Sequence, residues 1–202
     1  RFIKTDDGIT VTPIKKDIKE ATIFAKSSGS TLRFMICVCA GLGIKLHIDG
    51  SPRLRERPVG DLINVLEKHG LKFSSKSLPL TMDGEIKSES IDISANVSSQ
   101  YVTGLMLAGY GMHRKMQINV VGDIVSKDYI ILTEKIMKNV GINIENSGQT
   151  WTIYPTKDIT NEVIAGADWS SAAFFLVLGA INGKIIVKGL NPESYQGDKK
   201  II

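Results

Sequence analysis

The chain has 202 residues, an apolar fraction of 43% and a formal net charge of +4 at pH 7. This length and apolar content allow a substantial buried core and argue against disorder. No apolar run reaches the ~20 residues that cross a bilayer, so we expect no membrane partner. Because the lysines are dispersed and no aromatic residues alternate with them, we also expect no nucleic-acid binding.

The predicted elements repeat along the chain. Three polar segments, Ser28–Thr31, Ser98–Gln100 and Asp168–Ser171, each open an apolar helical run, and their starts lie about 70 residues apart, which indicates a repeated supersecondary unit. Helix starts rich in Ser and Gly offer free N–H groups and a positive dipole end to an anion. The sequence therefore predicts a pocket for a phosphorylated small molecule where such helix starts converge.

A second kind of helix alternates with the first. Arg57–Gly70 has proline near its first turn and glycine at its end, and Lys127–Gly141 closes in the same way. The remaining predicted elements, in chain order, are strands at Ile44–Ile48, Met116–Val121, Ile142–Glu145 and Thr150–Tyr154, a buried helix at Ala172–Ile181, and a strand at Lys184–Val187. The predicted unit is strand, helix, strand, helix, strand, strand. The sequence thus indicates an α/β (α+β) fold with two nearly complete units and the beginning of a third.

The cysteines and histidines give no sign of a metal site. Cys37 and Cys39 stand two apart on one predicted helix, so their side chains point to different faces and are poorly placed for a disulfide or a metal pair. We expect both to be buried apolar residues in a reducing cytoplasm, since no secretion leader is recognisable. His47, His69 and His113 are scattered without metal-ligand spacing.

Arginine is concentrated in one part of the chain. Arg53, Arg55 and Arg57 share one segment, and Arg33 precedes them. Forked donors beside a capped helix start favour an acidic small ligand. Structural roles compete with this interpretation: Arg53 and Arg55 are equally suited to surface ion pairs. Likewise, the serines at the predicted helix starts, and Asp168, are good helix caps.

Four motifs in order resemble one family. They are Gly50–Pro58 (GSPRLRERP), Ser98–Tyr101 (SSQY), Ser126–Tyr129 (SKDY) and Gly166–Ala172 (GADWSSA). Together they are similar to the 5-enolpyruvylshikimate-3-phosphate synthases, also called 3-phosphoshikimate 1-carboxyvinyltransferases. The resemblance runs from about Thr10 to Ile202 and implies the inside-out barrel of enolpyruvyl transferases, which has two lobes. It places residues 1–164 in the shikimate-phosphate lobe and residues 165–202 at the start of the return into the second lobe.

The resemblance implies a role for individual residues. Contacts to shikimate 3-phosphate are implied for Ser30, Ser98, Ser99, Gln100, Ser126 and Tyr129. Contacts to phosphoenolpyruvate are implied for Gly29, Arg57 and Gln100. The chain departs from the family at two places, with Ser27 where asparagine is usual and Asp128 where proline is frequent.

The implied reaction transfers the enolpyruvyl group from phosphoenolpyruvate to the 5-hydroxyl of shikimate 3-phosphate and releases phosphate, without a cofactor or metal. The family's N-terminal Lys-Ser motif and the acid–base groups of its second lobe have no counterpart here, so we assign no catalytic residue. We expect a monomer that binds shikimate 3-phosphate weakly and is inactive alone. Two alternatives stay open: the sister enolpyruvyl transferase acting on UDP-N-acetylglucosamine, and a non-catalytic small-molecule-binding module on the same repeats.

Overall fold

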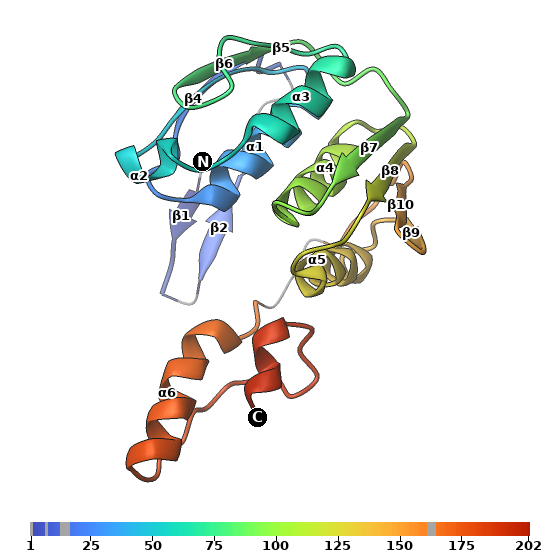
Figure 1. The fold of residues 1–202 in the computed structure, drawn as a ribbon. Helices are drawn as coiled ribbons and strands as arrows, with labels where there is room; N and C mark the ends of the chain where they lie inside the picture. Colours follow the sequence, from blue (N-terminus) through green and yellow to red (C-terminus); the bar gives the residue numbers. More distant parts are fainter. Residues whose placement is uncertain (1, 7, 13–16, 161–164) are drawn as a thin grey trace.

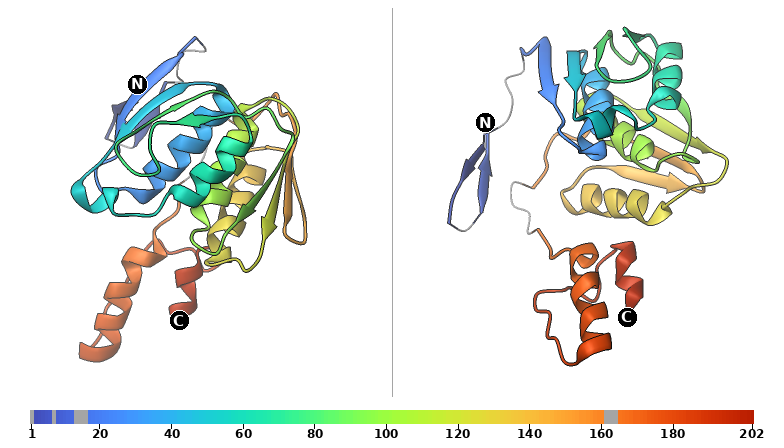
Figure 2. Two further views of the ribbon diagram at one scale, coloured as in Figure 1. Left: turned by 45° about the horizontal axis from the view of Figure 1, so that its top comes forward. Right: turned by 60° about the vertical axis from the view of Figure 1, so that its left-hand side comes forward.

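The computed structural model describes residues 2–6, 8–12, 17–160 and 165–202. The chain begins with a small hairpin of β1 (Phe2–Lys4) and β2 (Ile9–Val11), which stands apart from the sheets that follow (Figure 2). The first large unit comprises β3 (Glu20–Phe24), α1 (Gly29–Leu42), β4 (Lys45–Asp49), α2 (Pro52–Arg55), α3 (Gly60–Lys68), β5 (Lys72–Phe73) and β6 (Leu80–Asp83). The second comprises β7 (Ser90–Ser94), α4 (Gln100–Gly111), β8 (Met116–Val121), α5 (Lys127–Asn139), β9 (Ile144–Ser147) and β10 (Thr150–Ile153).

The two large units have the same topology, which confirms the predicted repeat. Their strand orders are β3-β4-β6-β5 and β7-β8-β10-β9. In both sheets the first pair of strands is parallel and the other pairs are antiparallel. A parallel pair needs a crossover, which α1 supplies in the first unit and α4 in the second. The expected mixed α/β fold is therefore confirmed.

Each sheet covers the helices with one face and turns the other to solvent. Along β7, Ile91 and Ile93 are buried while the residues between them are exposed, and the same alternation runs along β4 and β10. Figure 1 shows the helices gathered on the inner side of the two sheets. The core consequently lies between helices and sheets, and the helix ends remain free to form a site.

Helices α1 and α4 pack side by side and parallel. Arg33 of α1 contacts Gln100 of α4, and further along the helices Gly41 of α1 lies against Ala108 of α4. Between these contacts, a Cβ added at Gly104 would lie 2.8 Å from the Cys37 sulfur, so glycine is required for this close approach. Because the helices are parallel, their N-termini open at the same end of the core.

The two cysteines are free and buried, as predicted. Cys37 is fully buried and Cys39 is 2% exposed. Burial raises the pKa of the Cys39 thiol to about 11 and raises that of Cys37 further still. Both thiols therefore stay protonated and unreactive at neutral pH.

The predicted helix Arg57–Gly70 was too long at both ends, and a short helix before it was missed. Helix α3 covers Gly60–Lys68, and α2 covers Pro52–Arg55 with Ser51 as its N-cap. Proline disfavours helical backbone at the residue before it. In addition, the Pro58 carbonyl accepts hydrogen bonds from Arg33 and Tyr101 instead of a helical N–H. Because the Pro58 carbonyl makes these contacts, α2 and α3 are two separate helices.

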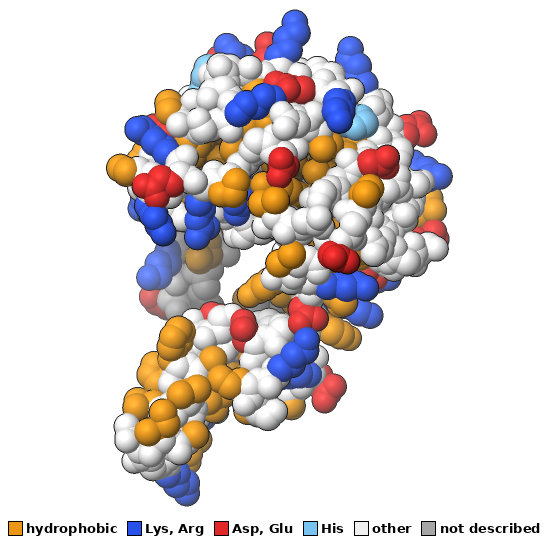
Figure 3. Space-filling model, in the orientation of Figure 1, with side chains coloured by type: hydrophobic (Ala, Val, Ile, Leu, Met, Phe, Trp, Pro, Cys, Tyr) orange, Lys and Arg blue, Asp and Glu red, His pale blue; other side chains and the backbone are white. Residues whose placement is uncertain are grey.

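Two predictions about the C-terminal part were wrong. A helix does form there, α6 (Trp169–Asn182), but Phe174 is 79% exposed, and only Trp169 and Ala172 of this helix are buried. The apolar side chains of α6 form the orange surface in the lower part of Figure 3. Residues 184–187 form no strand, because no described strand lies beside them to pair with. A short 3-10 helix, η1 (Gly197–Ile201), ends the chain, and the predicted boundary at residue 164 lies outside the described residues.

Glu134 is a buried carboxylate in the core of the second unit. It is 8% exposed, accepts a hydrogen bond from Trp151 Nε1 at 2.9 Å, and accepts another from Lys138 Nζ at 2.7 Å. Burial raises its pKa, but the hydrogen bonds from Lys138 and Trp151 outweigh that effect, so the pKa lies below its ordinary value of 4.5. The ionised form is therefore favoured in the folded state.

Glu134 should make stability depend on acid pH. A carboxylate whose pKa is lowered by folding stabilises the fold above its unfolded-state pKa, and this stabilisation is lost as the pH falls through the folded-state pKa. We expect Glu134→Gln to be less stable than the wild type at neutral pH, and the difference to shrink between about pH 5 and pH 3. Urea unfolding across this range measures it, with the exposed Glu89→Gln as the control. A difference independent of pH would contradict the assignment.

Candidate functional site

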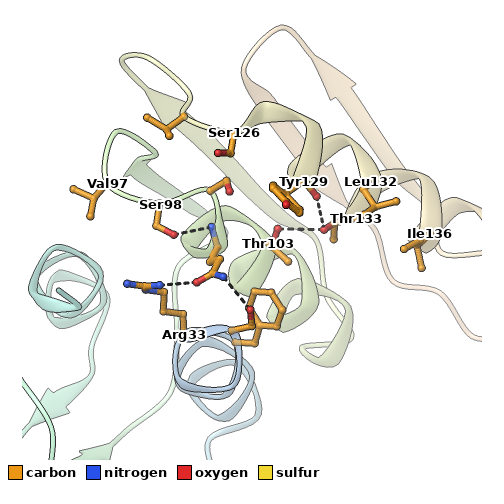
Figure 4. Close-up of a pocket in the computed structure, with 14 residues that line it drawn as sticks. Arg33, Val97, Ser98, Thr103, Ser126, Tyr129, Leu132, Thr133 and Ile136 are labelled. Carbon is orange, nitrogen blue, oxygen red and sulfur yellow. Dashed lines mark hydrogen bonds between the residues drawn. The ribbon is translucent and has the colours of Figure 1, made fainter. Parts of the chain in front are cut away.

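A pocket of about 580 Å³ opens at the N-terminal ends of the parallel helices. Its walls come from the start of α1, the segment before α4 with the start of α4, and the first turns of α5 (Figure 4). The lining residues are Ser30, Arg33, Phe34, Val97, Ser98, Ser99, Gln100, Thr103, Val125, Ser126, Tyr129, Leu132, Thr133 and Ile136. All six residues predicted to contact shikimate 3-phosphate line this one pocket, although they come from three separate segments of the chain.

The wall from α4 offers two hydroxyls and an amide at a helix start. The Ser98 hydroxyl accepts a hydrogen bond from the Gln100 N–H at 3.2 Å and so caps the first turn, which was the structural role weighed against ligand binding. Ser99 is 5% exposed, and no side-chain cap bond is formed by it. The N–H groups of Gln100, Tyr101 and Thr103 all donate to Ser98 or Ser99. This helix start therefore offers a phosphate its two serine hydroxyls and the positive end of the helix dipole.

The carboxamide of Gln100 lies between two elements. Its Oε1 accepts from Arg33 Nη1 at 2.6 Å, and its Nε2 donates to the Ser30 hydroxyl at 2.9 Å. Figure 4 shows these two bonds crossing the floor of the pocket from α4 to α1. The wall from α1 and the wall from α4 are therefore connected through one side chain.

Gly29 and Arg57 meet next to Arg33. A Cβ added at Gly29 would lie 2.5 Å from Arg57 Nη1 and 3.1 Å from Arg33 Nη1. Within the described residues, the Arg57 guanidinium makes no ion pair. Two guanidinium groups thus converge on a residue without a side chain, which is an arrangement suited to an anion. The structure brings Gly29 and Arg57 together, as the sequence predicts.

The wall from α5 holds a strained residue. Ser126, the residue before α5, has a φ of +56°, which lies in the left-handed region that non-glycine residues seldom adopt. The Tyr129 ring is 50% exposed, and its carbonyl accepts from the Thr133 hydroxyl at 2.9 Å. Strained residues of this kind are frequent at ligand sites.

The sequence analysis named structural roles as alternatives to ligand binding, and the structure shows most of them at the expected residues. Ser28 caps α1 by accepting from the Thr31 N–H at 3.1 Å, and Asp168 caps α6. Arg53 pairs with Glu56, and Arg55 makes two bonds to Asp49 that lower the pKa of that carboxyl. These arginines are engaged in surface contacts, whereas Arg57 is not.

The two departures from the family pattern have local partners. The Ser27 hydroxyl lies 2.9 Å from the Ser51 hydroxyl, which connects the loop before α1 to the start of α2. The Asp128 carboxylate pairs with Lys200 at 2.7 Å. Its negative charge is therefore partly neutralised beside the pocket.

Arg33 was grouped in the sequence analysis with the arginines that favour an acidic ligand, but it was given no specific contact in this site. It is 6% exposed and is the only charged side chain among the described residues that line the pocket. One signal could have identified it: Arg33 stands four residues after Gly29, so both lie on the same face of a helix. Thr103, 6% exposed, was also missed.

The described residues hold neither a cluster of metal ligands nor a helix that could span a membrane. Among the described ranges, no group of three or more His, Cys, Asp or Glu side chains is arranged to hold a metal ion. No helix in the described part of the chain is both long and apolar enough to cross a membrane. The pocket offers hydroxyls, an amide and a guanidinium, which are groups that bind and orient an anion.

Comparisons with known proteins agree with these observations. A curated relative from Thermococcus kodakarensis, named 3-phosphoshikimate 1-carboxyvinyltransferase, is 38% identical over 192 residues, which cover 95% of this chain and 47% of the relative. A relative of the same name from Brachyspira hyodysenteriae is 32% identical over 199 residues, covering 98% of this chain and 47% of that protein. The chain thus spans about half the length of the curated relatives it matches.

Solved structures show the same fold. One EPSP synthase from Acinetobacter baumannii has a TM-score of 0.65 at 18% identity, covering 85% of this chain and 40% of that one. Another structure of EPSP synthase from that organism has a TM-score of 0.63 at 19% identity, with coverages of 80% and 36%. The family model for EPSP synthase (3-phosphoshikimate 1-carboxyvinyltransferase) matches residues 3–202. The chain therefore belongs to the EPSP synthase family.

Proposed function

We propose that this chain supplies the shikimate-3-phosphate-binding part of an enzyme that transfers the enolpyruvyl group of phosphoenolpyruvate to the 5-hydroxyl of shikimate 3-phosphate, with release of phosphate. The observation that supports this most is the pocket: Ser30, Gln100 and Tyr129 come from three elements, and each lines it. The curated relatives carry the name of this activity.

In this proposal the pocket residues, with Gly29 and Arg57 beside them, bind and orient the two substrates. Ser98 and Ser99 at the start of α4 hold the phosphate of shikimate 3-phosphate, and Ser126 and Tyr129 contact the same substrate from the opposite wall. Arg57 holds phosphoenolpyruvate beside Gly29, and Gln100 lies between the two ligands. Holding the two anionic substrates in line lowers the entropic contribution to the activation free energy of the reaction.

None of the roles proposed above is that of the acid–base groups that the reaction requires. An attacking hydroxyl must lose a proton, and the methylene carbon of phosphoenolpyruvate must gain one. The described residues that line the pocket include no Asp, Glu, His or Lys for these proton transfers. We therefore expect the 202-residue chain to bind shikimate 3-phosphate and to show no turnover alone.

Calorimetric titration with shikimate 3-phosphate tests the proposal. We expect saturable binding that Gln100→Ala weakens about tenfold, because a hydrogen bond to a charged group contributes about 1.5 to 3 kcal/mol. Gln149→Ala, an exposed glutamine outside the pocket, is the matched control and should bind like the wild type.

Two results would contradict this assignment. Binding of UDP-N-acetylglucosamine in place of shikimate 3-phosphate would identify the sister transferase. Equal affinities for wild type and Gln100→Ala would place the ligand elsewhere on the chain.

A further inference from the structure

Arg33 is a buried cation without a carboxylate partner among the described residues. Its side chain is 6% exposed, its Nη1 donates to Gln100 Oε1 at 2.6 Å, and its Nη2 donates to the Pro58 carbonyl oxygen at 3.0 Å. Its Nε is buried and has no hydrogen-bond partner. Burying a charge is costly unless its donors are satisfied, so these two bonds strongly restrict where the guanidinium can lie.

The position of Arg33 is also fixed by packing. Its guanidinium carbon lies 5.7 Å from the centroid of the Tyr101 ring. Burial raises the pKa of Tyr101, so its hydroxyl stays protonated and donates to the same Pro58 carbonyl at 3.2 Å. Arg33 therefore connects α1, the segment before α3 and the start of α4.

This connection determines which way the Gln100 carboxamide faces. An arginine side chain only donates hydrogen bonds, so the atom of Gln100 that faces Arg33 must be the oxygen. The nitrogen is then directed to the Ser30 hydroxyl, 2.9 Å away. Without Arg33, the carboxamide could rotate by half a turn and present the wrong atom to a ligand.

We propose that Arg33 is a positioning residue of the substrate site: it orients the Gln100 carboxamide and, through the Pro58 carbonyl, holds the neighbouring Arg57 against Gly29 at the start of α1. Its effect on ligand binding rests on the function proposed above. In this proposal Arg33 acts on the ligand through Gln100 and Pro58.

A double-mutant cycle tests this inference with shikimate 3-phosphate as the ligand. Arg33→Lys keeps the positive charge but loses the fork that reaches both acceptors. We expect Arg33→Lys and Gln100→Ala each to weaken binding about tenfold, and the double variant to bind no more weakly than Gln100→Ala. A loss of about a hundredfold in the double variant would mean that the two residues act independently, and would overturn the proposal. Arg53→Lys, at an exposed arginine outside the pocket, should leave affinity unchanged.

The side-chain amide signals of Gln100 provide a test that needs no ligand. In the wild type, NMR should show that the Gln100 amide protons exchange with water much more slowly than those of the exposed Gln149, because Arg33 and Ser30 hold the group. Equally fast exchange at Gln100 and Gln149 in the wild-type chain would overturn the proposal even if Arg33→Lys fails to fold. If the wild type does not bind shikimate 3-phosphate, the proposed function falls, and the amide signals still decide whether Arg33 positions Gln100.

Discussion

Replacing Trp151 by alanine is expected to remove a large part of the stability of the two large units. Trp151 on β10 is fully buried, and its Nε1 donates to the buried Glu134. Truncating a buried tryptophan costs about 3 to 5 kcal/mol, and here it also leaves the Glu134 carboxylate with one hydrogen bond fewer. Domains of this kind are stable by about 5 to 15 kcal/mol, so the loss is a large part of the total. Urea unfolding followed by circular dichroism measures it.

The chain contains a matched control at its other tryptophan. Trp169 is 3% exposed, but it packs in the C-terminal part, where its Nε1 donates to the Asn191 carbonyl at 3.0 Å. Trp169→Ala should disturb α6 and η1 and leave the main unfolding transition within about 1 kcal/mol of the wild type. Equal losses from both variants would show that the two parts unfold together, contrary to the separate packing seen in Figure 1.

Replacing Gly29 by alanine is expected to weaken ligand binding without lowering the stability of the fold. The added Cβ would lie 2.5 Å from Arg57 Nη1, so the flexible end of Arg57 has to move away. Losing one charge-assisted hydrogen bond costs about 1.5 to 3 kcal/mol, which weakens phosphoenolpyruvate binding about tenfold or more. The helix itself should not be weakened, because alanine is a better helix former than glycine.

Titration with phosphoenolpyruvate in the presence of shikimate 3-phosphate measures the effect of this change. Gly60→Ala is the matched control: Gly60 is the first residue of α3, as Gly29 is of α1, and its added Cβ would have only the Lys76 carbonyl oxygen as a neighbour, at 4.0 Å. This variant should bind like the wild type. Unchanged phosphoenolpyruvate affinity in Gly29→Ala would exclude Arg57 as the group that holds it.

The repeat and the convergence of the site could be predicted because both depend on local patterns. Helix starts such as Ser98–Gln100 follow from capping preferences, and the closing glycines follow from backbone conformation. Once the spacing shows that the unit repeats, the same ends of equivalent helices must point the same way. This reasoning places Ser30 and Gln100, distant in the sequence, at one pocket, whereas the third predicted helix start, Asp168–Ser171, does not line it.

Other features depend on contacts that a sequence does not display. The break between α2 and α3 follows from the Pro58 carbonyl turning toward Arg33, a contact across 25 residues of chain. The prediction that α6 is buried was wrong. An apolar sequence indicates that a helix face can be covered, but it does not identify what covers that face. The sequence groups Arg33 with the other arginines, but it does not reveal the hydrogen bond from Arg33 to Gln100 Oε1.

The close contact between α1 and α4 restricts how this sequence can change over time. At Gly41 an added Cβ would lie 3.0 Å from both the Cβ and the backbone oxygen of Ala108. At Gly104 the neighbours include the Arg33 backbone oxygen at 3.1 Å, which no substitution can remove. Each glycine thus faces a backbone oxygen of the partner helix, so a smaller side chain on that helix cannot compensate for a larger residue at either position.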